Sequence, residues 1–276
     1  MSEMHSYGVN NQAFRLKVMG WIALFSLIVS LQLQPLIDLV RTNISNALPL
    51  PRDVSPISFF TIIFTLSFIA YDRWLWKLNP FDKIPSLSGT WIGMGNNPHF
   101  ELLRLELMQI DQTWTSISIS VEVYQQNKSG PENWLDTVHL GTEHSTNARI
   151  TECLRKYCDF NFQYIHDGEA GGQDSFGGTF FLKYKYKKMK NRKVEIHELS
   201  GKYSNTKTGK NTKTGEKFEG VVGRIAFRRV SLEILELEDA LEKGKDYLNE
   251  LTKEISSHIT HIPHPKCHNV SKEEGA

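Results

Sequence analysis

The sequence predicts a β-rich domain attached to two N-terminal transmembrane helices, and three observations favour this fold class. Two apolar runs lie near the N-terminus, a pattern of alternating apolar and polar residues follows them, and a heptad-like apolar stripe comes last. The predicted fold is therefore two transmembrane α-helices, an all-β antiparallel eight-stranded barrel and a C-terminal helix. The expected boundaries are 1–83 for the helical hairpin, 84–230 for the barrel and 231–276 for the extension.

The two apolar runs predict a transmembrane hairpin. The first begins at Val18 and continues with few polar interruptions to Val40, and the second extends from Ile57 to Tyr71 and is followed by further aromatic and leucine residues. At a rise of 1.5 Å per residue, spans of about 18–40 and 54–76 are long enough to cross a bilayer. The alternatives are a secretory signal peptide, two buried core helices, or one span followed by a core helix.

The basic residues beside these runs predict the orientation of the hairpin. Arg15 and Lys17 precede the first span, and Arg73, Lys77 and Lys83 follow the second. The positive-inside rule then predicts a multi-pass membrane protein with both termini in the cytoplasm. The odd number of cysteines, three, agrees with a reducing compartment.

The net charge limits the class of partner. A formal charge of +1 over 276 residues makes long nucleic acid an improbable ligand, because binding it needs many phosphate contacts. A ligand with only two or three phosphates needs just a few local cations. No nucleophile elbow, zinc-ligand pair on a helix or glycine-rich phosphate loop is present in the sequence, so a binding protein is favoured over an enzyme.

The region after Pro85 has the periodicity of half-buried strands. In the clearest segment, 113–124, Ile117, Ile119, Val121 and Val123 share one face and polar residues the other. Eight such segments are expected: 87–95, 100–110, 113–124, 147–154, 157–165, 178–187, 194–204 and 221–230. Short connections favour an antiparallel meander, for which eight strands are the usual number in a small closed barrel; an open sandwich is the alternative.

Two features bear on how such a barrel is closed. Gly89 and Trp91 lie in the first strand and Arg224 in the last, which resembles the Gly-x-Trp and late-strand Arg of lipocalin-type barrels. In that lipocalin-like arrangement the indole closes one end and the guanidinium stacks on it. Gly89, Trp91 and Arg224 are therefore expected to be structural.

Inward-facing tyrosines are the first candidates for ligand contact. Alternation directs Tyr164, Tyr184 and Tyr203 to the interior together with several phenylalanines, and each hydroxyl there needs a polar partner. With Arg224 they form the predicted ligand-binding set. Lys183 and its neighbours at alternate positions are expected on the solvent face.

The C-terminal extension predicts one amphipathic helix and a polar tail. Its apolar residues follow steps of three and four, with Gly244 in the stripe, so the helix either forms a short coiled coil or packs on the barrel wall. The tail is rich in histidine, but Pro263 and Pro265 interrupt any regular helix. No metal site or cofactor is therefore predicted.

The order of these features resembles the SMODS-associated two-transmembrane, β-strand-rich effectors of bacterial CBASS anti-phage defence. The resemblance covers roughly 10–230 and follows the two spans with the segments 84–91, 110–114, 199–205 and 223–227. It implies that a cyclic di- or trinucleotide, made by a linked nucleotidyltransferase, binds the cytoplasmic barrel. It also implies that the bound chain forms homo-oligomers and disrupts the inner membrane.

Two other functions stay open on the residues alone. A membrane-tethered lipocalin-like binding protein for an apolar small molecule would use the aromatic interior. A structural anchor would recruit partners through the heptad helix.

Overall fold

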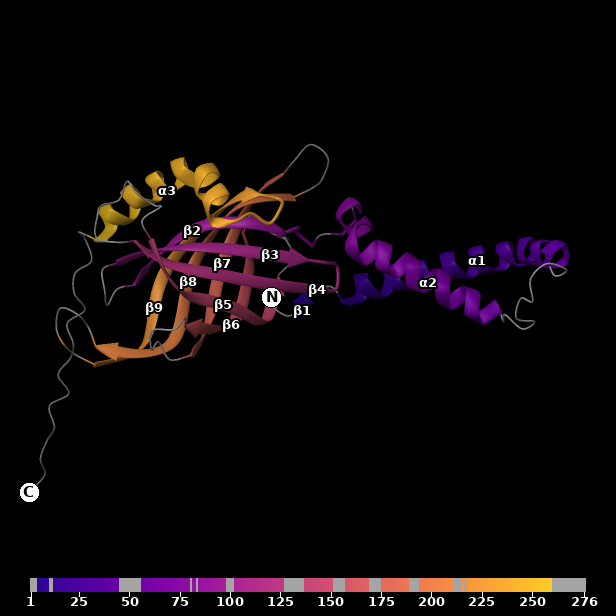
Figure 1. Cartoon of the computed structure of the whole chain (residues 1–276), viewed down its shortest axis with the longest axis horizontal. Helices are drawn as coiled ribbons and strands as arrows, with labels where there is room; N and C mark the ends of the chain where they lie inside the picture. Colours follow the sequence, from indigo (N-terminus) through magenta and orange to yellow (C-terminus); the bar gives the residue numbers. More distant parts are fainter. Residues whose placement is uncertain are drawn as a thin grey trace, which may run out of the picture.

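The computed structural model describes residues 4–9, 12–44, 56–79, 81–82, 84–97, 102–126, 137–150, 157–168, 175–188, 194–210, 215 and 217–259. Within these residues the strands form one sheet, two long helices project from one end of it, and a third helix lies on its outer surface (Figure 1). The histidine-rich tail predicted after Ile259 lies outside the described residues.

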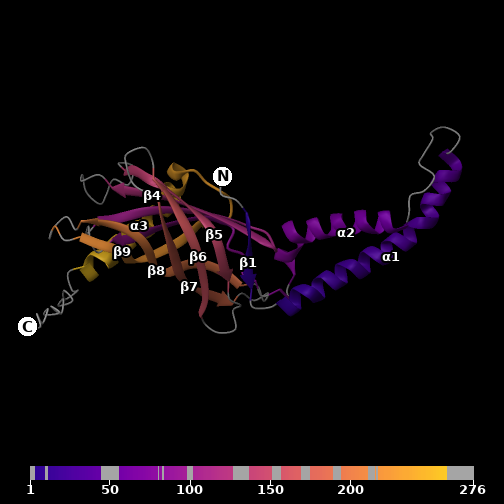
Figure 2. The same cartoon turned by 90° about the horizontal axis from the view of Figure 1, so that it is seen from below.

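The two projecting helices run side by side away from the sheet in both views (Figures 1 and 2). α1 comprises Gln12–Ile44 and α2 comprises Pro56–Arg73. α2 begins at a proline, whose fixed φ suits the first helical position and whose missing N–H costs nothing there. A short 3₁₀ helix, Leu75–Leu78, follows α2 on the way to the first strand after it, β2.

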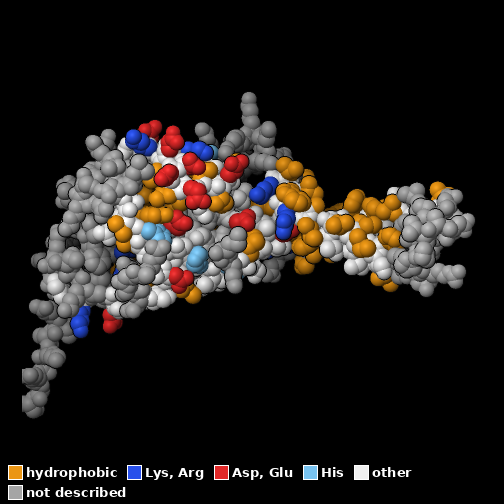
Figure 3. Space-filling model, viewed as in Figure 1, with side chains coloured by type: hydrophobic (Ala, Val, Ile, Leu, Met, Phe, Trp, Pro, Cys, Tyr) orange, Lys and Arg blue, Asp and Glu red, His pale blue; other side chains and the backbone are white. Residues whose placement is uncertain are grey.

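One helix among the described residues, not two, is long and apolar enough to cross a membrane. The qualifying stretch is Ala13–Pro35 of α1, with 23 residues. The expected second span, 54–76, is corrected to the 18-residue helix Pro56–Arg73, which ends in the charged pair Asp72 and Arg73. On the face in Figure 3, hydrophobic side chains dominate the apolar arm formed by α1 and α2, whereas charged side chains lie over the sheet and where the helices join it.

The sheet has nine described strands, one more than expected. Their bounds are β1 His5–Val9, β2 Gly89–Asn97, β3 Leu102–Gln112, β4 Ser116–Gln126, β5 Thr137–Ile150, β6 Tyr157–Gly168, β7 Phe176–Lys188, β8 Val194–Lys210 and β9 Lys217–Ser231. β2 to β9 correspond in order to the eight expected strands. The additional strand, β1, precedes α1, so the expected boundary at residue 83 separates a strand from its own sheet.

The expected strand 147–154 begins ten residues earlier in the structure. β5 starts at Thr137, and its inward side there carries the small or polar residues Gly141, Glu143 and Ser145. An inward face without apolar side chains has no hydrophobic alternation to detect. Residues 151–154 of the expected strand lie outside the described part of the chain.

The pairings of the strands close on themselves. The order is β1-β4-β3-β2-β9-β8-β7-β6-β5, and β4 also pairs with β5. All pairs are antiparallel except that of β1 with β5. β4 and β5 pair directly from Ser120 to Gln126 of β4, and β1 lies between them beyond that point, with His5 beside Ile117 and Tyr7 beside Ala148.

The third helix, α3 (Leu237–Ile259), covers the outer face of β2 and β9. Leu241, Leu248 and Leu251 pack there against a cluster that includes Ile92 and Leu105. Gly244 lies over Ile92, where an added Cβ would come within 2.5 Å of a methyl carbon, so glycine permits the close approach. The predicted heptad stripe is therefore used within the chain, on the wall of the sheet.

Candidate ligand-binding site

The three predicted tyrosines all point into the interior of the closed sheet. Tyr164, Tyr184 and Tyr203 are buried in one apolar cluster with the inward phenylalanines. The Tyr203 hydroxyl donates to the Asn96 carbonyl at 3.0 Å, and Tyr164 hydrogen-bonds the Asn205 side chain. Burial raises the pKa of both Tyr164 and Tyr203, so both phenols stay neutral hydrogen-bonding groups.

Two glycines make room for these rings. A Cβ added at Gly178 would lie 2.4 Å from the Tyr164 ring, and one added at Gly223 would lie 2.3 Å from the Tyr203 ring. Each tyrosine thus lies over a strand position without a side chain. The arrangement permits large aromatic residues inside a sheet that already contains Phe160, Phe162, Phe180 and Phe227.

The fourth predicted residue, Arg224, does not face the interior. It is exposed on the outer face of β9, where its backbone N–H donates to Asn96 Oδ1 at 2.9 Å. In β9 the buried residues are Val221, Ile225 and Phe227, at odd-numbered positions. Strand alternation therefore turns the even-numbered Arg224 outward.

Arg229 holds the place that was expected for Arg224. Its guanidinium carbon lies 5.1 Å from the centroid of the fully buried Trp91 ring. Its nitrogens donate to the carbonyls of Ser86 (3.1 Å), Ser88 (3.4 Å) and Ile196. The Trp91 indole N–H in turn donates to the Leu87 carbonyl at 2.9 Å. The Trp–Arg closure is thus present with a different arginine.

Gly89 has a structural role that its conformation explains. Its φ of +123° is a backbone state that L-residues with side chains seldom adopt. A Cβ there would also lie 2.2 Å from the Ser231 carbonyl oxygen of the neighbouring strand. The chain therefore enters β2 tightly beside the end of β9, at the end of the sheet that carries the helices.

The opposite end of the interior contains acidic and imidazole groups that the sequence analysis did not select. Glu106 of β3, Glu143 of β5 and His166 of β6 are 4%, 5% and 1% exposed. Among the described residues, Glu106 Oε2, Glu143 Oε2 and both His166 ring nitrogens have no hydrogen-bond partner. His166 Nδ1 lies 3.5 Å from Glu143 Oε1, at the limit of a hydrogen bond. We call these three residues the distal cluster.

Burial controls the protonation of the distal cluster. It raises the pKa of Glu143 to about 8, against the smaller opposing effect of Arg104. Burial also raises the pKa of Glu106, with a further contribution from the Glu143 carboxylate. It lowers the pKa of His166 to about 4, and the nearby cations Lys207 and Arg104 act in the same direction. At neutral pH all three side chains are therefore mainly uncharged.

Two cations and an aromatic ring accompany the cluster. Arg104 precedes Glu106 by two positions on β3 and so lies on the same face of the strand. Lys207 of β8 lies 5.5 Å from the centroid of Phe176, and the His166 ring stacks on Phe176 at 4.4 Å. Burial, and then the charge of Arg104, lowers the pKa of Lys207. Positive charge, flat rings and unpartnered polar atoms thus meet at one end of the interior.

This combination is suited to a small polar ligand that carries negative charge. Buried polar groups without partners are unfavourable, and a ligand that supplies hydrogen bonds relieves that cost. Cations bind phosphate or carboxylate oxygens, and aromatic faces stack on flat rings. Among the described residues no group of three or more His, Cys, Asp or Glu side chains is arranged to hold a metal ion.

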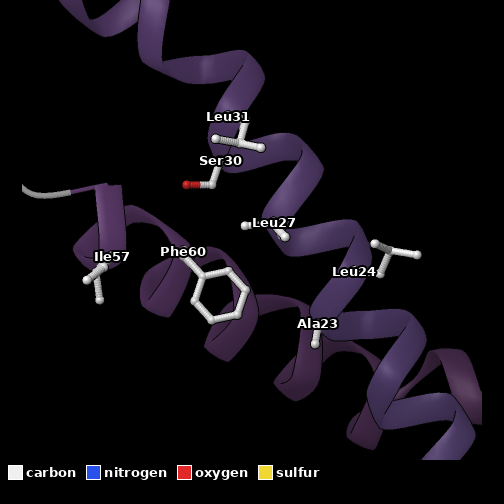
Figure 4. A pocket seen from close by; sticks show the side chains of 7 residues that line it. All are labelled: Ala23, Leu24, Leu27, Ser30, Leu31, Ile57 and Phe60. Carbon is white, nitrogen blue, oxygen red and sulfur yellow. The ribbon is translucent and has the colours of Figure 1, made fainter.

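A separate apolar cleft of about 470 Å³ lies between α1 and α2, far along the chain from the distal cluster. Ala23, Leu24, Leu27, Leu31, Ile57 and Phe60 line it, with the single hydroxyl of Ser30 (Figure 4). Such a lining offers no charge or paired donors for a nucleotide. The cleft therefore belongs to the apolar arm and not to the polar candidate site.

Sequence reasoning could have reached the distal cluster by alternation. Glu106 shares a face with the buried Met108 and Ile110, and His166 shares one with Phe162 and Tyr164. The assumption that charged residues face solvent hid this signal. No protein-family model matches the chain, and neither the curated proteins nor the solved structures include a significant match.

Proposed function

We propose that this chain is a membrane-anchored sensor and effector of the CBASS type, whose β-domain is a lipocalin-like barrel that binds a cyclic oligonucleotide. One observation carries the proposal: a buried polar cluster with unpartnered atoms lies with two cations at the end of the interior opposite the helices. Phosphates would pair with Arg104 and Lys207, and a base would stack near Phe176.

The protonation of the cluster supports a base-binding role. Neutral Glu106 and Glu143 each offer one O–H donor and an acceptor oxygen, which is the pattern needed to hydrogen-bond the edge of a nucleobase. Neutral carboxyls also add no charge that would repel phosphates. Asn205 and the phenol of Tyr164 contribute further polar groups beside them.

The connection of the chain supports a hairpin that crosses the membrane twice. β1 and the later strands belong to one sheet, so the chain leaves the sheet through α1 and returns to it through α2. If α1 crosses a bilayer, the returning segment must cross it as well. An 18-residue helix is about 27 Å long, close to the roughly 30 Å of the hydrocarbon core.

The segment directly after α2, which we call the neck, has side chains suited to the interface between lipid and water. Trp74, Leu75, Leu78 and Phe81 are all exposed there, and Lys77 lies among them. Exposed tryptophan with a basic residue is typical of the boundary between lipid and water. The basic residues beside the helices support the orientation that we propose: the chain is a bacterial inner-membrane protein with both termini in the cytoplasm.

Ligand binding tests this function directly. Full-length protein in detergent is heated with cyclic di-AMP, cyclic di-GMP, cyclic UMP–AMP and a cyclic trinucleotide, and unfolding is followed by tryptophan fluorescence. A ligand at a hundred times its Kd stabilises the folded state by about 2.7 kcal/mol. We expect at least one nucleotide to raise the melting temperature.

Matched variants make the assignment of the site specific. Arg104→Gln and Lys207→Gln are expected to remove the nucleotide-dependent shift, whereas Arg224→Gln on the outer face is expected to retain it. A panel without any shift contradicts nucleotide sensing. A shift that survives both Arg104→Gln and Lys207→Gln contradicts this location for the site.

The aromatic interior favours a second candidate, a lipocalin-like carrier of an apolar molecule. Its rings, however, pack on one another: Phe162 stacks on Phe180 at 4.6 Å and Tyr164 contacts Phe180 at 4.9 Å. A carrier is expected to co-purify with lipid or to bind a fluorescent fatty acid. Displacement of that fatty acid, together with no response to nucleotides, would favour the carrier.

A further inference from the structure

Both helices are hydrogen-bonded to the same short turn of the sheet. The turn, Thr113–Ser116, connects β3 to β4 at the end of the sheet from which α1 and α2 project. We propose that this turn is the coupling element through which the sheet sets the positions of both helices. As a route for a ligand signal, the inference rests on the proposed function; as a mechanical link, it does not.

α2 binds the turn through its last residues. The Asp72 carboxylate accepts hydrogen bonds from the Thr115 backbone N–H at 2.8 Å and from the Thr115 hydroxyl at 2.7 Å. The Asp72 carbonyl accepts a third bond, from the Trp114 backbone N–H, at 2.9 Å. The Tyr71 ring meets the Trp114 ring edge-on at 5.0 Å. The end of α2 is thus fixed to the turn in position and direction.

α1 binds the same turn from its first turn. Arg15 donates from a guanidinium nitrogen to the Trp114 carbonyl at 2.6 Å, and its guanidinium lies 5.6 Å from the Trp114 ring centroid. The same guanidinium lies 5.0 Å from the ring centroid of Tyr7. An arginine donating to a carbonyl while stacked on two rings has little freedom to rotate. Trp114 therefore contacts both helices.

β1 and β3 hold the turn from the side of the sheet. The Tyr7 hydroxyl contacts the carbonyls of Thr113 at 3.1 Å and Trp114 at 3.0 Å. Gln112, the last residue of β3, donates to the Tyr7 hydroxyl at 3.3 Å and to the Pro85 carbonyl at 3.2 Å, and it accepts from the Leu87 N–H at 2.7 Å. Tyr7, Trp114 and Gln112 are all buried. The turn is therefore continuous with the closed sheet.

One strand connects this turn to the candidate site. β3 carries Arg104 and Glu106 near its start and ends at Gln112 beside the turn. The six residue steps from Glu106 to Gln112 span about 20 Å in an extended strand. β3 pairs with β2 from Leu102 to Ile110 and with β4 from Arg104 to Gln112, so a displacement at its start is carried along a rigid element. A ligand at the distal cluster thus contacts the strand that holds both helices.

The mechanical link is tested without any ligand. The full-length protein is first prepared with its three cysteines replaced by serine. In one variant, spin labels are attached at Gln163→Cys of β6 and Leu24→Cys of α1. In a second variant, they are attached at Gln163→Cys and Leu66→Cys of α2. All three positions are exposed. Pulsed electron paramagnetic resonance then gives the distance distribution between the sheet and each helix in lipid nanodiscs.

We call the contacts of Asp72 and Arg15 with the turn residues Trp114 and Thr115 the clamp. Variants that remove these contacts are compared with matched controls. Thr115→Val combined with Asp72→Ala is expected to broaden the distribution to α2, and Arg15→Met the distribution to α1. Thr61→Val and Lys17→Met are the controls, because the Thr61 hydroxyl donates to the Ile57 carbonyl of its own helix and Lys17 is exposed. Distributions in the clamp variants as narrow as in the controls would overturn the inference, whether or not any nucleotide binds.

The signalling role is tested on the same proteins in liposomes loaded with carboxyfluorescein. Cyclic di-AMP, cyclic di-GMP and cyclic UMP–AMP are each added, with nucleotide binding measured in parallel by melting temperature. We expect Thr115→Val with Asp72→Ala to keep the nucleotide shift and to lose most of the dye release. Dye release equal to that of wild type in this variant would overturn the inference. If no nucleotide changes the melting temperature of the wild-type protein, the proposed function is contradicted, and the spin-label distances alone decide whether the mechanical link exists.

Discussion

The two ends of the closed sheet use polar side chains in opposite ways. At the end that carries the helices, Arg229 donates to three carbonyls while stacked on Trp91. At the distal end, Glu106, Glu143 and His166 are buried but keep unpartnered atoms. A buried polar group whose partners are all within the chain stabilises the fold, whereas one without partners costs stability. The difference is the reason why we assign a structural role to the first end and propose ligand binding at the second.

The largest effect is expected at the structural end. Trp91→Ala removes a fully buried indole and the ring beneath Arg229, so we expect a loss of about 3–5 kcal/mol in unfolding free energy. Thermal unfolding of the full-length protein in detergent measures this loss as a fall in melting temperature. Trp74→Ala is the matched control, because that indole is 61% exposed. Equal losses in the two variants would remove the proposed distinction between the ends.

The distal end is expected to give stability a distinctive dependence on pH. The folded state raises the pKa of Glu143 to about 8, so between the ordinary carboxyl pKa and about 8 it binds more protons than the unfolded state. Stability is then highest at low pH and falls as the pH rises, by up to about 1.4 kcal/mol per pH unit for one group. His166, whose pKa is lowered to about 4, has the opposite slope, but only below its ordinary value of 6.5.

Between pH 6.5 and 8 the carboxyl effect therefore acts without opposition from His166. We expect the melting temperature of wild type to fall across this interval and that of Glu143→Gln to fall clearly less. Glu219→Gln, an exposed carboxyl on β9, is expected to keep the wild-type slope. A slope in Glu143→Gln as steep as in wild type would mean that this carboxyl is not held neutral by the fold.

The smallest effect is expected on the outer face. Arg224→Gln changes an exposed side chain and should alter the unfolding free energy by less than about 0.5 kcal/mol. Arg229→Gln, which leaves buried carbonyls with fewer donors, should cost about 1–3 kcal/mol. The melting temperatures of the two variants decide which arginine closes the sheet. Equal costs would contradict the closing role assigned to Arg229.

Alternation in the sequence was sufficient to locate most of the sheet and the direction of its tyrosines. The eight expected segments correspond to β2 to β9, and Tyr164, Tyr184 and Tyr203 point inward. The same alternation would have turned Arg224 outward and Arg229 inward, since Ile225 and Phe227 lie between them. The likeness to a lipocalin-type motif predicted a closing role for Arg224, but strand alternation turns that residue outward, so the arginine prediction was wrong.

The remaining differences have non-local causes. β1 has only five residues, and its partners lie more than a hundred residues away, so no local pattern marks it as a strand. The distal cluster was missed because burial of Glu106 and Glu143 contradicts the usual exposure of carboxylates. Functional sites are where such rules are expected to fail, since binding requires groups that the fold alone does not satisfy.

The place of β1 in the sheet affects how the chain is completed during synthesis. These five residues leave the ribosome before α1, and their partners on β4 and β5 follow only after both long helices have been made. The gap that β1 fills between β4 and β5, beside Ile117 of β4 and Ala148 of β5, therefore stays open until β1 pairs there. A fragment that starts after α2 would keep unpaired strand edges along that gap, although β4 and β5 still pair from Ser120 to Gln126. Such edges are sites for self-association. The isolated sheet should therefore be expressed with His5–Val9, connected to the chain before β2 by a linker that replaces both helices.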